Sequence, residues 1–327
     1  MQRTNSLGNV RNVFAIAAEW LEQNRPFALG TLVALRDAAT APIGTTVAVD
    51  AQGCVFGNIG AGCYEAEIVE ACVKTAHDGQ MRRVDIDLTS NDELSGTTGC
   101  GATMGVLVWR PQAAFRSVAR AIATGERDVR LIVEGNEERD GSHVAFEHVF
   151  AQKERLILVG ATALAGELAA LARRLDFHVV VVDPRPAFAT TLRVPDACEI
   201  VRAWPDEYLP GVLSEHTPIV MLSHDPKFDL AGLHCALESN APYIGLLGSR
   251  RSQAARRASL RAAGVEERAL ARIHGPVGLE LGGTSLPETA LSILAEVVAV
   301  RHGAGGRPLR SGRGAIHRQL EGLPAGS

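Results

Sequence analysis

The stretch that decides the fold runs from residue 156 to residue 183 and is LILVGATALAGELAALARRLDFHVVVVD. It begins with four consecutive apolar residues, turns at Gly160 and continues into a helical segment from Glu167 to Leu175. A second apolar run, from His178 to Val182, ends at Asp183. Short, wholly apolar strands joined by a helix are typical of a parallel sheet that is covered on both faces. We therefore predict a β-α-β unit of a doubly wound fold.

The pattern on each side of this unit predicts two domains. After it, apolar strands are expected at residues 219–222 and 243–247, each followed by a helix, and a last helix over 286–301 begins with a capping box at Ser285 and Glu288. Before it, amphipathic helices alternate with short strands. The predicted fold class is α/β, with the following domains: an α+β domain over 1–152, a Rossmann-like doubly wound parallel sheet over 153–303, and a flexible basic tail over 304–327.

The composition excludes several classes of function. The 327 residues are 46% hydrophobic and 21% charged, with a net charge of −4, so no basic footprint indicates nucleic acid binding. No apolar run is long enough to span a bilayer, and no signal peptide is recognisable at the start. We therefore expect a cytoplasmic protein with neither a nucleic acid nor a membrane as its partner.

Two cysteines lie in glycine-rich turns, where a core residue would have few side chains to pack against. Cys63 follows Gly62 just before a predicted helix that includes Glu65, and Cys100 precedes Gly101 just before a predicted strand. Glycine permits close approach of a ligand, and a helix N-terminus favours the thiolate. Soft ligands in such loops suit a sulfur- or metal-bearing partner. The remaining cysteines lie among apolar residues and are predicted to be core residues: Cys54, Cys72, Cys198 and Cys235.

The turn at Gly160 is similar to the dinucleotide-binding pattern but lacks its middle glycine. Gly160 makes the tight turn, Ala165 is acceptable at the third position, and Asp183 is placed to bind a ribose hydroxyl. Thr162, however, puts a side chain where a pyrophosphate needs bare backbone. The pattern predicts the fold and argues against tight NAD(P) binding.

Further polar groups follow the later strands. Ser249 and Arg250 open a helix after the strand at 243–247, which indicates a phosphate site of amides, a hydroxyl and a guanidinium. Arg257, further along this helix, is expected to be solvated. His274 is expected in a loop at the same rim. Ligands of open α/β sheets bind at the carboxyl ends of the strands, so these residues are candidate ligand contacts.

In their order, these motifs resemble the xanthine dehydrogenase accessory proteins of the XdhC/CoxI type. The resemblance extends over nearly the whole chain and includes the segments 57–65, 99–101, 158–161, 183–186, 224–226, 248–251, 273–279 and 292–299. It implies a cytoplasmic chaperone that binds molybdenum cofactor (molybdopterin), supports its sulfuration with a cysteine desulfurase and inserts it into a molybdenum hydroxylase client. A homodimer is expected. No protein side chain is expected to bind a metal directly; molybdenum would arrive with the cofactor, near Cys63 and Cys100.

The resemblance assigns the candidate residues to two kinds of contact. Cys63 and Cys100 would lie near the metal, with Glu65 as a proton or hydrogen-bond partner, and the Gly160 turn or the Ser249–Arg250 loop would hold the phosphate. Two alternatives stay open. One is an NAD(P)-dependent oxidoreductase that uses the Rossmann half, and the other is a scaffold whose Rossmann half only mediates dimerisation.

Overall fold

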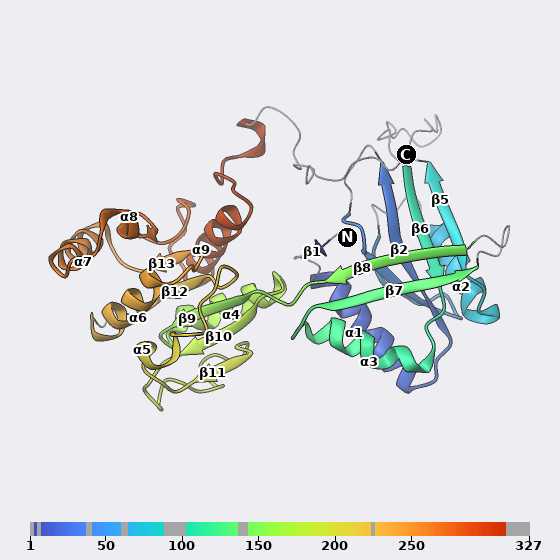
Figure 1. Cartoon of the computed structure of the whole chain (residues 1–327), viewed down its shortest axis with the longest axis horizontal. Helices are drawn as coiled ribbons and strands as arrows, with labels where there is room; N and C mark the ends of the chain where they lie inside the picture. Colours follow the sequence, from blue (N-terminus) through green and yellow to red (C-terminus); the bar gives the residue numbers. More distant parts are fainter. Residues whose placement is uncertain are drawn as a thin grey trace. The chain divides into compact units, whose positions relative to one another are not determined.

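The computed structural model describes residues 3–4, 8–36, 41–59, 65–87, 103–136, 143–223 and 226–311. These residues form two compact units that divide between Lys153 and Glu154. Each unit has its own apolar cores. Figure 1 labels the helices and strands of both units. Within residues 304–311 of the expected tail, a short 3-10 turn, η2, covers Leu309–Ser311.

The N-terminal unit is built around a five-stranded antiparallel sheet of strand order β4-β3-β2-β6-β5. A separate sheet of order β1-β8-β7 contributes to the core on the α1 and α3 side, and α2 covers the opposite face of the five-stranded sheet. The elements are β1 (Arg3–Thr4), α1 (Gly8–Glu22), β2 (Phe27–Arg36), β3 (Thr46–Asp50), β4 (Val55–Gly57), α2 (Glu65–Asp78), β5 (Arg82–Asp87), β6 (Thr103–Trp109), η1 (Ala113–Phe115), α3 (Arg116–Thr124), β7 (Val129–Asn136) and β8 (His143–Phe150).

Strand direction places the end of β4 and the start of β6 at one edge of the five-stranded sheet. Each strand in the order β4-β3-β2-β6 is antiparallel to its neighbour. The end of β4 and the start of β6 therefore face the same edge. The chain beyond β4 leads toward Cys63, and the chain before β6 comes from Cys100, although both cysteines lie outside the described residues.

The C-terminal unit is a six-stranded parallel sheet of order β11-β10-β9-β12-β13-β14, with helices on both faces. Numbered from β9, this is the Rossmann order 3-2-1-4-5-6. The α/β prediction is thus confirmed. The elements are β9 (Arg155–Val159), α4 (Ala163–Arg174), β10 (His178–Val182), β11 (Glu199–Val201), α5 (Pro205–Tyr208), β12 (Ile219–Met221), α6 (Pro226–Glu238), β13 (Ile244–Leu246), α7 (Arg250–Ala262), α8 (Glu267–Leu270), β14 (Ile273–His274) and α9 (Leu286–Arg301).

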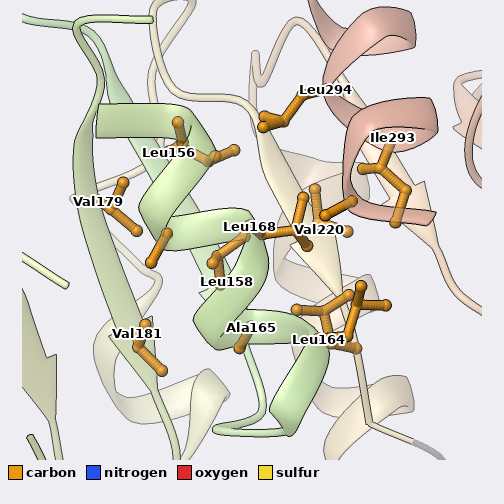
Figure 2. Packing of buried hydrophobic residues seen from close by; sticks show 14 of the residues in the cluster. Leu156, Leu158, Leu164, Ala165, Leu168, Val179, Val181, Val220, Ile293 and Leu294 are labelled. Atoms are coloured by element: carbon orange, nitrogen blue, oxygen red, sulfur yellow. The ribbon is translucent and has the colours of Figure 1, made fainter. Parts of the chain in front are cut away.

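Buried aliphatic side chains hold α4 and α9 against one face of the parallel sheet. Figure 2 shows Leu168 of α4 beside Leu158 and Val220 of the strands, with Ile293 and Leu294 of α9 alongside. All five side chains are almost entirely excluded from solvent. Burying a side chain of this size contributes about 1.5–3 kcal/mol, so this layer fixes the strand ends that carry the polar groups.

Candidate functional site

The strand order makes the carboxyl ends of β9 and β12 the place where ligands of open α/β sheets bind. The chain leaves β9 toward β10 on one side, whereas β12 lies on the other side, so the direction of winding reverses between them. Here the Gly160 turn lies against Ser223. A Cβ at Gly160 would be 3.2 Å from the Ser223 amide nitrogen, and φ is +105° at Gly160. Glycine is therefore required there for close approach and for backbone conformation.

Asp183 holds this turn through four hydrogen bonds. Its Oδ2 accepts from the Ala161 amide (2.8 Å) and from Arg185 Nη2 (2.7 Å), and its Oδ1 accepts from the Arg185 amide (3.0 Å) and Nε (2.9 Å). The carboxylate is 1% exposed. Burial would raise the pKa of Asp183, but the hydrogen bonds from Arg185 and Ala161 outweigh it and keep the pKa below its ordinary value. Asp183 thus shapes the turn, and a ribose hydroxyl would have to compete with these donors.

Thr162 caps α4, so the helix begins at Ala163 and not at Glu167 as predicted. The Thr162 hydroxyl accepts from the Ala165 amide at 3.2 Å. The Ala161 amide donates to Asp183, and the Ala165 amide donates to Thr162. The amides of Ala163 and Leu164 lie in the first turn of α4, where no carbonyl of the helix can accept from them. These two amides are therefore the donors available to a ligand. A phosphate would find two amides there rather than the open glycine-lined backbone of a dinucleotide site.

The Ser249–Arg250 loop opens α7 as predicted. Ser249 Oγ accepts from the Ser252 amide at 3.2 Å, and both Ser249 and Arg250 are exposed. The prediction that Arg257 is solvated was wrong. Its Nη1 and Nη2 donate to the carbonyls of Leu270 and Ile273, each at 2.9 Å, and so tie α7 to α8 and β14.

His274 belongs to a partly buried polar cluster that the sequence did not predict. It lies in the edge strand β14 and not in a loop. Its Nδ1 is 3.1 Å from Glu296 Oε1, while Glu296 Oε2 accepts from the Tyr243 hydroxyl and the Gly278 amide, each at 2.7 Å. Burial opposes ionisation of Glu296, but the donors from His274, Tyr243 and Gly278 lower its pKa overall.

An ionised carboxylate can only accept, so His274 donates from Nδ1 and keeps Nε2 for another contact. The sequence signal for this cluster was a glutamate inside the apolar run 293–300 of helix α9.

Of the residues predicted to form the thiol site, Glu65 is the one that the structure describes. It is the first residue of α2, two positions after Cys63, and its Oε1 is buried with no hydrogen-bond partner among the described residues. A buried acceptor without a donor is costly, which makes it a candidate ligand contact. The remaining predicted members, Gly62, Cys63, Cys100 and Gly101, lie outside the described residues.

The other four cysteines differ in how far they are exposed to solvent. Cys72 is buried, as predicted, and burial raises the pKa of its thiol to about 12. Cys235 is half-buried. The core assignment of Cys54 and Cys198 was wrong, because both are exposed beside the short strands β4 and β11. In the described ranges no group of three or more His, Cys, Asp or Glu side chains is arranged to hold a metal ion.

Two family models match the chain. Residues 156–297 match the model described as the XdhC Rossmann domain, and residues 20–87 match the model of the XdhC and CoxI family. Together they cover more than half of the sequence. No helix in the described part of the chain is long and apolar enough to cross a membrane.

Proteins of similar sequence carry related names. The chain is 25% identical over 301 residues to the molybdenum cofactor insertion chaperone PaoD of Escherichia coli K12, covering 89% of this chain and 88% of PaoD. It is 25% identical over 320 residues to a probable xanthine dehydrogenase subunit of Bacillus subtilis, covering 86% of this chain and 95% of that relative. It is also 25% identical over 295 residues to the uncharacterized protein YqeB of E. coli K12, covering 90% of this chain but 47% of YqeB, about half of that relative's length.

The fold also matches a solved structure. A crystal structure of a protein described as a xanthine dehydrogenase from Bacillus halodurans superimposes with a TM-score of 0.71 at 22% identity. The match covers 91% of this chain and 98% of that chain.

Proposed function

The chain belongs to the XdhC and CoxI family, and from this premise we propose that it binds molybdenum cofactor and delivers it to an enzyme of the xanthine dehydrogenase type. In this role it shields the cofactor, supports its sulfuration together with a cysteine desulfurase, and acts in the cytoplasm as a homodimer. The names of two relatives support this, one an insertion chaperone and the other a xanthine dehydrogenase subunit. The proposed role is that of an accessory protein and not of a catalyst.

One observation on this chain carries the proposal: Glu65 Oε1 is buried and has no hydrogen-bond donor among the residues that the structure describes. The cofactor is a pterin with a dithiolene-bound metal and a terminal phosphate, and a pterin presents N–H groups that match a carboxylate. In the proposed site Glu65 accepts a hydrogen bond from the cofactor, and Cys63 and Cys100 flank the metal from loops that also contain Gly62 and Gly101. The cofactor itself supplies the metal; the chain orients it and excludes water.

In the C-terminal unit we propose two candidate contacts for the phosphate. The first is the start of α4 at Gly160, shaped by Asp183, and the second is the start of α7 at Ser249 and Arg250. Helix N-terminal amides and a guanidinium suit an anion. His274, oriented by Glu296, offers Nε2 as a further candidate contact in this unit.

Cofactor retention by cysteine variants tests the thiol site. The full chain is produced in cells that make the cofactor and purified without air, and molybdopterin is measured by the fluorescence of its oxidised pterin. Cys100→Ala should keep the parent's thermal midpoint and carry much less molybdopterin, whereas the exposed Cys54 provides a matched control, Cys54→Ala, that should equal the parent.

Cys72→Ala distinguishes a structural effect from loss of the site. Removal of this buried side chain should cost about 1–2 kcal/mol of unfolding free energy without selective loss of molybdopterin. If Cys100→Ala unfolds early but retains the full cofactor content, the thiol assignment is wrong.

A further inference from the structure

Exposed aromatic, aliphatic and guanidinium groups gather on the excursion between β10 and β11 and at the end of β11. The excursion follows Asp183, and Gly166 of α4 lies against it, since a Cβ at Gly166 would be 3.1 Å from the Arg193 carbonyl oxygen. We call the group the arginine–aromatic surface; its members are Arg185, Phe188, Leu192, Arg193, Arg202 and Trp204.

Contacts within the unit hold four of these six side chains in place. The guanidinium carbons of Arg185 and Arg193 lie 4.1 Å and 4.8 Å from the centroid of the Phe188 ring. Arg193 Nε donates to the Ala161 carbonyl at 3.3 Å, and Arg202 Nε donates to the Ala189 carbonyl at 3.1 Å. Because these side chains are already held, a partner that binds them loses less conformational entropy on association.

The apolar members of this surface are exposed to solvent and do not pack into a core. Leu192 is 91% exposed, and Phe188 and Trp204 are 36% and 41% exposed. Aromatic residues and arginine are enriched among the residues that dominate binding at protein interfaces. An isolated exposed leucine needs no explanation, but Leu192 is next in sequence to Arg193, whose guanidinium lies over the Phe188 ring.

The charge of the surface indicates the kind of partner. The carboxylate of Asp183 compensates Arg185, but Arg193 and Arg202 make their recorded hydrogen bonds to main-chain carbonyls and form no ion pair within the described residues. Acidic side chains near them in sequence contact other groups: Asp196 Oδ1 is 3.9 Å from Arg173 Nη1, Glu199 Oε2 is 3.8 Å from Arg155 Nη2, and Glu207 accepts from the Trp204 amide. Two guanidinium charges thus remain for a partner with carboxylates at its surface.

We propose that the arginine–aromatic surface is where this chain docks its client protein, through an acidic face of the client that has an apolar centre. A protein fits better than a nucleic acid, because the chain has a net charge of −4 and Leu192 needs an aliphatic partner. The identity of the client rests on the proposed function.

Two single variants test the surface in the full chain. Leu192→Asp removes the apolar contact and Arg202→Glu reverses a charge, and neither changes a residue of the proposed cofactor site. Matched controls on the same unit are Leu309→Asp, at a leucine that is 70% exposed, and Arg307→Glu at an exposed arginine. Binding to cofactor-free xanthine dehydrogenase of the same organism is measured at several salt concentrations, and molybdopterin content is measured in parallel.

We expect both surface variants to bind about tenfold more weakly or worse, with the cofactor content of the parent, and both controls to bind like the parent. The affinity of Arg202→Glu should also depend less on salt. Surface variants that bind like the parent overturn this proposal alone. Failure of the parent to bind overturns the proposed function and this proposal with it. Loss of self-association by the variants in sedimentation, with client binding intact, would assign the surface to a second copy of the chain and overturn the proposal.

Discussion

Replacing Asp183 by asparagine should destabilise the C-terminal unit strongly. Each carboxylate oxygen accepts two hydrogen bonds, Oδ1 from the Arg185 amide and Nε, and Oδ2 from Ala161 N and Arg185 Nη2. In either orientation an asparagine amide group would face two donors. Two hydrogen bonds to a charged group at about 1.5–3 kcal/mol each would be lost, and Arg185 is exposed enough to recover part of this in water. We therefore expect a loss of about 3 kcal/mol, within the range for breaking a buried ion pair.

Calorimetry of the full chain measures this effect. A loss of about 3 kcal/mol in a unit of this size lowers the unfolding midpoint by about 6–12 °C, and only the transition of the C-terminal unit should move. Asp196→Asn is the control, because Asp196 Oδ1 is 3.9 Å from Arg173 Nη1 and both side chains are about half exposed, so it should cost under about 1 kcal/mol.

The pH dependence of the unfolding free energy is a second test of the Asp183→Asn variant. The pKa of Asp183 is lowered in the folded chain, so its contribution is complete above the ordinary carboxyl pKa and is lost as the pH falls through the lowered one. The difference between parent and Asp183→Asn should therefore be constant near neutral pH and shrink in strong acid. A midpoint within about 3 °C of the parent at pH 7 would refute this account of the turn.

Three further predictions concern His148, Glu296 and Thr162. Burial lowers the pKa of His148 to about 4, so about 3 kcal/mol of stability in the N-terminal unit should be lost as the pH falls from about 6.5 toward 4; urea unfolding across this range should show the loss in the parent and not in His148→Phe, and a flat profile in the parent contradicts it. Glu296→Gln should alter the tautomer of His274, visible in the ¹⁵N shifts of its ring, and an unchanged spectrum would show that Glu296 does not orient the imidazole. Titration with NADH should give weak binding at best, and Thr162→Gly should strengthen it; micromolar or tighter binding by the parent would favour the oxidoreductase alternative.

Local pattern predicted most of the fold, because its signals lie within single elements. The apolar run 156–159 and the turn at Gly160 specified β9 and its exit, and the capping box at Ser285 marked the start of α9 as observed. The start of α4 was placed four residues late, because a threonine cap at Thr162 does not stand out among small apolar residues. The strand β14 was missed because two residues carry too little periodicity.

The candidate site was predicted less completely, since it depends on contacts between distant residues. Tyr243 and Glu296 are 53 positions apart, and nothing local joins them. Arg257 was taken for a solvated residue because its acceptors, the carbonyls of Leu270 and Ile273, are main-chain groups that leave no trace in sequence. The helix start beside Cys63 is a local signal, and α2 does begin at Glu65, whose part in a ligand site stays a prediction.

The central claim, that this chain carries molybdenum cofactor, is tested most directly by the content of the protein itself. The full chain should be purified without air from cells that make the cofactor, and its molybdenum, its molybdopterin and its absorption spectrum should be measured together. We predict that molybdenum and molybdopterin accompany the chain in equal amounts and that both fall together in Cys100→Ala. A parent chain that contains neither metal nor pterin while it binds its client, or one that instead binds a nicotinamide nucleotide tightly, would contradict the claim.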